Sequence, residues 1–151
     1  MTDISARLAY ANIFARDPAA LALFYQRVFG FAEIMANRSP IFVCLDAGGI
    51  ELGFNAEQAY GLMGLGDRKP RSVAALRTFL SIEVSAPEAI DKAVTAALEN
   101  GGNLVKAAYD TYYNARTAIV EDPEGNVFRI NHRKGRRIPA QELEDPPWEQ
   151  D

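Results

Sequence analysis

One order of elements, a strand, a helix and three strands, occurs twice in this sequence, and the repetition limits the possible folds more than any other feature. The first half has these patterns at 8–15, 17–30, 32–37, 41–46 and 50–54. The second half has them at 79–84, 85–101, 103–108, 115–120 and 126–131. A single βαβββ unit cannot bury both faces of its small sheet. We therefore expect an α+β fold in which two βαβββ modules form an eight-stranded, half-closed mixed sheet around a cleft, with the helices outside.

Short signals mark where the two helices begin and end. The pair Asp17-Pro18 is typical of the N-cap and first position of a helix, and Gly30 is typical of the residue that ends one. In the second half, Ser85 and Glu88 have the spacing of a capping box. Each helix is therefore expected to follow the first strand of its module after a short turn.

The length of 151 residues suits one domain with a sizeable core. We expect this domain at residues 1–137 and an acidic C-terminal tail at residues 138–151. Within the domain, module one, a connector and module two are expected at 7–55, 56–77 and 78–132. The connector is rich in glycine, which is typical of a linker, and is expected to hold a short helix at 72–76.

Composition and charge exclude several classes of protein. The net charge of −4 argues against a general nucleic-acid binder, and no apolar run approaches the ~18 residues of a membrane span. The single cysteine, Cys44, allows no internal disulfide, which fits a reducing, cytoplasmic location. With His132 as the only histidine, one chain cannot build a zinc site from two or three histidines.

Alternation along the strands predicts which side chains face the cleft. The last strand follows a tight turn at Asp122-Pro123-Glu124-Gly125 and places Phe128 and Ile130 on one face and Arg129 on the other. The same parity, applied to the first and last strands of both modules, gives the residues expected on the cleft side. They are Tyr10, Asn12, Phe14, Glu51, Gly53, Asn55, Phe79, Ser81, Glu83, Arg129 and Asn131.

Glu51 and Arg129 occupy the same place in the two repeats, and two interpretations stay open for them. They could form a salt bridge that only ties the halves together, because isolated buried charges are costly. Alternatively, Arg129 holds a carboxylate or phosphate of a ligand and Glu51 accepts hydrogen bonds from it. The loop at 109–114 adds Tyr112 and Tyr113, which either close over a ring-bearing ligand or pack a surface loop.

Four sequence segments resemble the vicinal oxygen chelate superfamily, which includes glyoxalase I, the bleomycin-resistance proteins and the extradiol dioxygenases. The segments are Ala15-Arg16-Asp17-Pro18, Phe24-Tyr25-Gln26-Arg27-Val28-Phe29-Gly30-Phe31, Ile50-Glu51-Leu52 and Glu121-Asp122-Pro123-Glu124-Gly125-Asn126. The resemblance covers roughly residues 7 to 132 and implies the fold described above. It does not define an activity, because this scaffold supports many functions.

The resemblance also implies where a metal ion would be bound in metal-dependent relatives. Those proteins place one ligand on the first strand and one on the last strand of each half. The corresponding residues here are Tyr10, Glu51, Phe79 and Arg129. Only Glu51 keeps a carboxylate, a phenylalanine cannot coordinate, and an arginine repels a divalent ion. We therefore predict no metal site and no cofactor.

Three functions stay open at this point. The first is a metal-independent binding protein of the bleomycin-resistance type, a homodimer that holds an aromatic or anionic small molecule with Arg129 as anchor. The second is a metal-free lyase, isomerase or hydrolase, with Glu51 or Glu83 as general base and Arg129 or Tyr10 stabilising an oxyanion. The third is a structural dimeric module. A metal-dependent lactoylglutathione lyase or dioxygenase is a less favoured function than these three, because the residues at the metal positions do not match.

Overall fold

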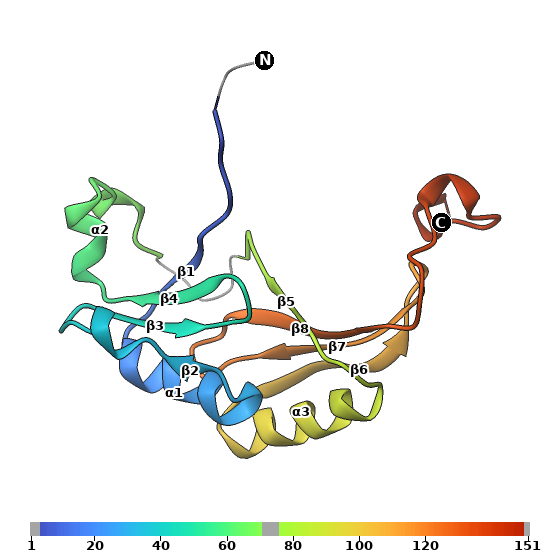
Figure 1. Cartoon of the computed structure of the whole chain (residues 1–151), viewed down its shortest axis with the longest axis horizontal. Helices are drawn as coiled ribbons and strands as arrows, with labels where there is room; N and C mark the ends of the chain where they lie inside the picture. The colour runs from blue at the N-terminus through green and yellow to red at the C-terminus, as the bar shows by residue number, and fades with distance from the viewer. Residues whose placement is uncertain (1–3, 71–75, 150–151) are drawn as a thin grey trace. The chain divides into compact units, whose positions relative to one another are not determined.

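Two compact units make up the chain, Met1–Ser72 and Val73–Asp151, and each holds one βαβββ module (Figure 1). The computed structural model describes residues 4–70 and 76–149. No helix within these residues is long and apolar enough to cross a membrane.

The first unit is a four-stranded mixed sheet with one long helix packed against it. Its main elements are β1 (Tyr10–Phe14), α1 (Pro18–Phe29), β2 (Ala32–Glu33), β3 (Phe42–Asp46) and β4 (Glu51–Asn55). The strand order is β1-β4-β3-β2, in which β1 and β4 are parallel and the other pairs are antiparallel. Helix α1 packs against β3 and β4. Its Leu21 and Phe24 are buried, as are Leu52 and Phe54 of β4.

The second unit repeats this arrangement. Its main elements are β5 (Leu80–Glu83), α3 (Glu88–Glu99), β6 (Asn103–Asp110), β7 (Ala115–Glu121) and β8 (Val127–Arg133). The order is β5-β8-β7-β6, again with a parallel outer pair, and α3 packs against β6, β7 and β8. The α+β class with two βαβββ modules is thus confirmed as two four-stranded mixed sheets. Their union into one eight-stranded sheet around a cleft stays a prediction.

The local signals at the first helix are confirmed, whereas the signal at the second is wrong. The Asp17 carboxylate accepts a hydrogen bond from the Ala20 amide at 3.0 Å, and Gly30 ends α1 with φ of 73°. No side chain caps α3, which begins only at Glu88 after Pro87. The Ser85 hydroxyl therefore lies before the first turn and does not make the predicted capping box.

The segments between the strands differ most from expectation. The strand predicted at 32–37 is only two residues long, and a 3₁₀ turn follows at Met35–Asn37. The connector holds a helix that was not predicted, α2 (Gln58–Leu62), and a 3₁₀ turn at Gly66–Arg68. The short helix expected at 72–76 falls almost wholly outside the described residues. Beyond β8, two further 3₁₀ turns lie at Ala140–Glu142 and Pro147–Glu149.

Candidate functional site

The second unit carries a polar cluster around Arg129, on the face of its sheet opposite α3. Phe128 and Ile130 of β8 are fully buried, and Arg129 between them is half-buried, as the alternation of a strand requires. Strand β8 lies between β5 and β7, so Arg129 occupies an inner strand of the sheet. The parallel register with β5 places Ser81 directly opposite Arg129.

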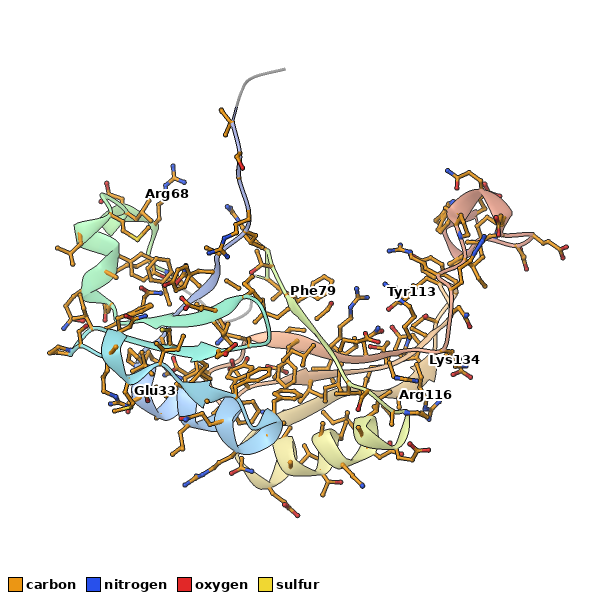
Figure 2. The ribbon with its side chains drawn as sticks, viewed as in Figure 1. Glu33, Arg68, Phe79, Tyr113, Arg116 and Lys134 are labelled. Carbon is orange, nitrogen blue, oxygen red and sulfur yellow. The ribbon has the colours of Figure 1, made fainter. Side chains whose placement is uncertain are left out.

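Two hydroxyl groups and two aromatic rings hold the Arg129 guanidinium. Its Nε donates a short hydrogen bond to Ser81 Oγ, and its Nη1 donates to Tyr113 Oη at 2.8 Å. The guanidinium carbon lies 5.2 Å from the Phe79 ring centre and 5.4 Å from that of Tyr113. Both rings lie on the same side of the sheet (Figure 2). These distances are within the range of cation–π attraction.

A chain of hydrogen bonds continues from this arginine along the face. Tyr113 Oη lies 3.5 Å from Asn131 Oδ1, and Asn131 Nδ2 donates to Glu83 Oε2 at 2.7 Å. The other oxygen of Glu83 accepts the Arg133 backbone N–H at 2.6 Å. Both oxygens of Glu83 therefore already accept hydrogen bonds within the second unit.

The Arg129 guanidinium keeps most of its hydrogen-bonding capacity. A guanidinium has five N–H groups, and within the described part of the second unit it forms only the two bonds to Ser81 and Tyr113. No carboxylate of the described residues in the second unit lies within ion-pair distance of Arg129. The cluster is consequently a preorganised cation between two rings, with N–H groups that have no protein acceptor in that part of the chain.

The polar face of the first unit is centred on Glu51, which lies opposite Tyr10 in the parallel register of β1 and β4. A hydrogen bond to Glu51 raises the pKa of the Tyr10 phenol, because the protonated phenol is the donor. The second oxygen of Glu51 is buried and has no hydrogen-bond partner among the described residues. A buried acceptor of this kind lacks the hydrogen-bond partner that such atoms usually have.

A hollow of about 360 Å³ opens beside Glu51 within the first unit. Its lining residues are Arg7, Ala9, Tyr10, Ile34, Asp46, Gly49, Ile50 and Glu51. The lining is mostly polar and includes both signs of charge, so the hollow suits a small polar group better than an aromatic ring.

The remaining candidate residues of the first unit already contact other side chains of that unit. Asn55 Nδ2 donates to Asn12 Oδ1 at 3.1 Å, across the buried Gly53. The Phe14 ring stacks on Tyr60 of α2, with the ring centres 3.7 Å apart. Tyr60 was not foreseen from the sequence, because the five-residue helix that carries it shows too few turns for a periodic pattern. Phe14 consequently offers only part of its ring to a ligand.

Two side chains beyond β8 join the cluster of the second unit without having been predicted there. Tyr112 packs edge-on against Trp148 with ring centres 5.5 Å apart, and Arg137 lies 5.6 Å from the Tyr113 ring centre. The only sequence signals were an isolated tryptophan and a basic run, and neither indicates a spatial neighbour. The predicted link between Glu51 and Arg129 stays a prediction.

The residues at the family's metal positions do not fit a divalent cation. Tyr10, Phe79 and Arg129 replace three of the four ligands that the resemblance implies, and one of the three is itself a cation. Among the described residues, no group of three or more His, Cys, Asp or Glu side chains could hold a metal ion.

Comparison with known proteins identifies the family. The model of the Glyoxalase/Bleomycin resistance protein/Dioxygenase superfamily matches residues 7–130, and the chain belongs to this superfamily. A crystal structure of a family enzyme from Burkholderia phytofirmans PsJN is 49% identical, with a TM-score of 0.80, and the match covers 84% of this chain and 98% of that one. Comparison with curated proteins gives no significant match.

Two more distant solved structures share the fold. A glyoxalase-related enzyme from Fulvimarina pelagi is 21% identical with a TM-score of 0.71, covering 89% of this chain and 93% of its own. A lactoylglutathione lyase from Agrobacterium tumefaciens is 18% identical with a TM-score of 0.63, covering 87% of this chain and 96% of its own. At these identities the likeness concerns the fold alone, and the activity has to be argued from the site.

Proposed function

We propose that this protein binds a small aromatic anion without a metal ion, and that Arg129 is the anchor for the anionic group. The observation that carries the proposal is the set of contacts that the Arg129 side chain makes. Its guanidinium is fixed by Ser81 and Tyr113, lies between two aromatic rings and has no carboxylate partner among the described residues of its unit. The rings of Phe79 and Tyr113 supply apolar contact for the aromatic part of the ligand.

Preorganisation is the physical reason for expecting useful affinity at this cluster. A free arginine loses much rotamer entropy when it binds an anion, whereas Arg129 is already held by two hydrogen bonds. A planar guanidinium also matches the geometry of a carboxylate or phosphate in a bidentate contact. In metal-dependent relatives the metal ion supplies the positive charge of the site. Here Arg129 would supply that charge.

Titration calorimetry with benzoate and with benzyl alcohol tests the proposal. The two probes share a ring, and only benzoate carries a charge. We expect benzoate to bind with a millimolar or lower Kd and Arg129→Ala to weaken it about 30-fold, equal to ~2 kcal/mol, because a hydrogen-bonded ion contact is lost. Arg129→Lys should recover only part of this affinity, since a lysine cannot form the bidentate contact.

Arg116 is a matched control on the neighbouring strand β7. It is also an arginine of this sheet, but its Nη1 lies 3.6 Å from Asp110, so its charge already has a partner. Arg116→Ala is expected to leave benzoate affinity within about twofold of the wild type. Equal binding of benzoate by wild type and Arg129→Ala, with both proteins folded by circular dichroism, would contradict the anchor role.

A second candidate, a metal-free lyase, isomerase or hydrolase, is favoured by the surroundings of Glu51. This carboxylate borders the 360 Å³ hollow, which brings it within reach of a small substrate, as a general base needs. Glu83 is the weaker candidate because both of its oxygens already accept hydrogen bonds. If a turnover is found, Glu51→Gln should abolish it while ligand binding is kept; undiminished turnover would remove Glu51 as the base.

The proposal also includes a homodimer in the cytoplasm. The dimer is proposed from the family resemblance, and the reducing location from Cys44, which is buried and free. Light scattering of the purified protein checks the subunit number, and a monomeric mass at micromolar concentration would contradict the dimer.

A further inference from the structure

The chain that leaves β8 returns to the cluster of Arg129 instead of running away from it. Lys134 and Arg136, the second and fourth residues of the basic run at 133–137, pair with carboxylates: Lys134 Nζ lies 2.7 Å from Asp110 and Arg136 Nη2 lies 2.8 Å from Glu142. Arg137 differs from these two. Its guanidinium carbon lies 5.6 Å from the Tyr113 ring centre, and no described carboxylate of its unit is within ion-pair distance.

Tyr113 therefore has two guanidinium groups against its ring, those of Arg129 and Arg137, at 5.4 and 5.6 Å from the ring centre. One aromatic ring can partly offset one cation, but two like charges at a shared ring repel each other. The carboxylate of this cluster, Glu83, is already hydrogen-bonded to Asn131 and to the Arg133 amide. The cluster thus holds two positive charges that the described residues do not neutralise by an ion pair.

The position of Arg137 is fixed by contacts on both sides of it. Before it, Asn114 donates from Nδ2 to the Arg136 carbonyl at 3.0 Å and accepts the Lys134 amide at 3.0 Å. Asn114 has φ of 65°, a left-handed conformation that asparagine tolerates better than most residues. After it, Trp148 packs edge-on against Tyr112, the neighbour of Tyr113. The tail is thereby attached to the same tyrosine loop that holds Arg129.

We propose that Arg137 is a second anion-binding residue of this site, and that the ligand is an aromatic dianion. The inference rests on the proposed function and deepens it, because it gives the charge of the ligand and assigns a role to the tail. Either two carboxylates or one phosphate on a ring meets this requirement. Residues Arg137 and Trp148 lie outside the part matched by the family model, residues 7–130.

Calorimetry with three probes of equal ring size but different charge tests the inference. The probes are benzoate, phthalate and phenyl phosphate, at a pH near 8 where the last two are dianions. Wild type is expected to bind at least one dianion about tenfold more tightly than benzoate. Arg137→Gln should remove this preference, lowering dianion affinity about tenfold and benzoate affinity less than twofold.

Two further variants separate a charge effect from a structural one. Arg137→Lys keeps the charge and should keep most of the dianion preference. Arg136 is the residue next to Arg137, and Arg136→Gln breaks its ion pair with Glu142. This variant should change the affinity for benzoate and for the dianions by no more than about twofold. Equal losses for benzoate and dianions in Arg137→Gln would show that the residue only supports the fold of the tail, and would overturn the inference.

The outcomes distinguish this inference from the proposed function. If benzoate binding depends on Arg129 while the dianions bind no better than benzoate, the proposed function stands and the second anchor is wrong. If none of the three probes binds wild type in the millimolar range, the proposed function fails, and the inference fails with it. A preference for only one of the two dianions supports the inference and selects between dicarboxylate and phosphate ligands.

Discussion

The two modules have the same topology and nearly opposite polar faces. In each, the first and last strands form a parallel pair, and the last strand buries alternate apolar residues, Leu52 and Phe54 in one and Phe128 and Ile130 in the other. On the opposite face the first module carries Glu51, and the second carries Arg129 in the corresponding strand. The buried alternation defines the module, while the other face is free to change its charge.

The partners of these two residues differ in a consistent way. Glu51 accepts a hydrogen bond from the Tyr10 hydroxyl, whereas Arg129 donates to the hydroxyls of Ser81 and Tyr113. A hydroxyl group can serve either charge, because it both donates and accepts. The registers also differ, since Glu51 lies opposite Tyr10 while Arg129 lies opposite Ser81 and not opposite Phe79. The sequence match of Tyr10 with Phe79 therefore does not extend to strand pairing.

The two tight turns before the last strands offer the largest contrast in stability. Asp122 is 1% exposed, and its carboxylate accepts the amides of Glu124 and Asn126 at 2.9 and 3.0 Å. In the first module, Asp46 is exposed, and the one donor to its carboxylate among the described residues is the Gly48 amide at 3.0 Å. Asp122→Ala should lower the free energy of unfolding by about 3 kcal/mol, and Asp46→Ala by about 0.5 kcal/mol.

Urea unfolding followed by circular dichroism measures both changes. The expected order arises because Asp122→Ala leaves two part-buried amides without their side-chain acceptor, while the Gly48 amide can bond to water. Similar losses for the two variants would mean that the turns contribute equally and that burial of Asp122 is unimportant.

Close packing on the polar face of the first module gives a second, smaller expected effect. A Cβ atom added at Gly53 would clash with Asn12 Oδ1 and lie 2.9 Å from the Phe42 ring, so an alanine at this position would force the Asn12 and Phe42 side chains to shift. Gly53→Ala should lower the free energy of unfolding by about 2 kcal/mol through overpacking. Gly61→Ala is the control, because nothing lies within 4 Å of its added Cβ and alanine is preferred in a helix such as α2. A neutral Gly53→Ala would refute the close approach.

The smallest expected effect is a pH dependence that arises from Tyr10 in the first module. Because bonding to Glu51 raises the pKa of Tyr10 above its ordinary value of 10.0, folding favours the protonated phenol. The stability from this bond is present below the ordinary pKa and is lost as the pH rises through the folded value. Unfolding free energies between about pH 9 and 11 should fall more steeply for wild type than for Tyr10→Phe or Glu51→Gln. Parallel slopes for all three would contradict the Tyr10–Glu51 bond.

Local, periodic features of the chain were predictable from the sequence. The alternation around Arg129 and the caps of α1 follow from nearest neighbours in the chain, and the structure confirms both. The turn at Gly125, which has φ of 84°, is likewise confirmed. The capping box at Ser85 failed because a proline in the same segment moved the start of α3, a competition that residue spacing does not reveal.

Contacts between distant segments were not predictable in the same way. Tyr60 covers Phe14 from a helix too short to give a pattern, and Trp148 reaches Tyr112 from the end of the tail. Single aromatic residues carry no periodicity, so the sequence indicates their burial and not their partners. The cluster of Arg129, Ser81 and Tyr113 was predictable only in part. The alternation along β8 predicted the face on which Arg129 lies, but not the hydrogen bonds that it makes there.

The central claim is that Arg129 binds an anion rather than only supporting the sheet. The most direct measurement is the ¹⁵N NMR resonance of Arg129 Nε, assigned by comparison with Arg129→Lys and followed during a benzoate titration. The account predicts that this resonance shifts in step with saturation, while the Nε resonance of Arg116, already paired with Asp110, stays within the shift caused by chloride. An unchanged Arg129 resonance at benzoate concentrations that shift other residues would contradict the claim and place the ligand elsewhere.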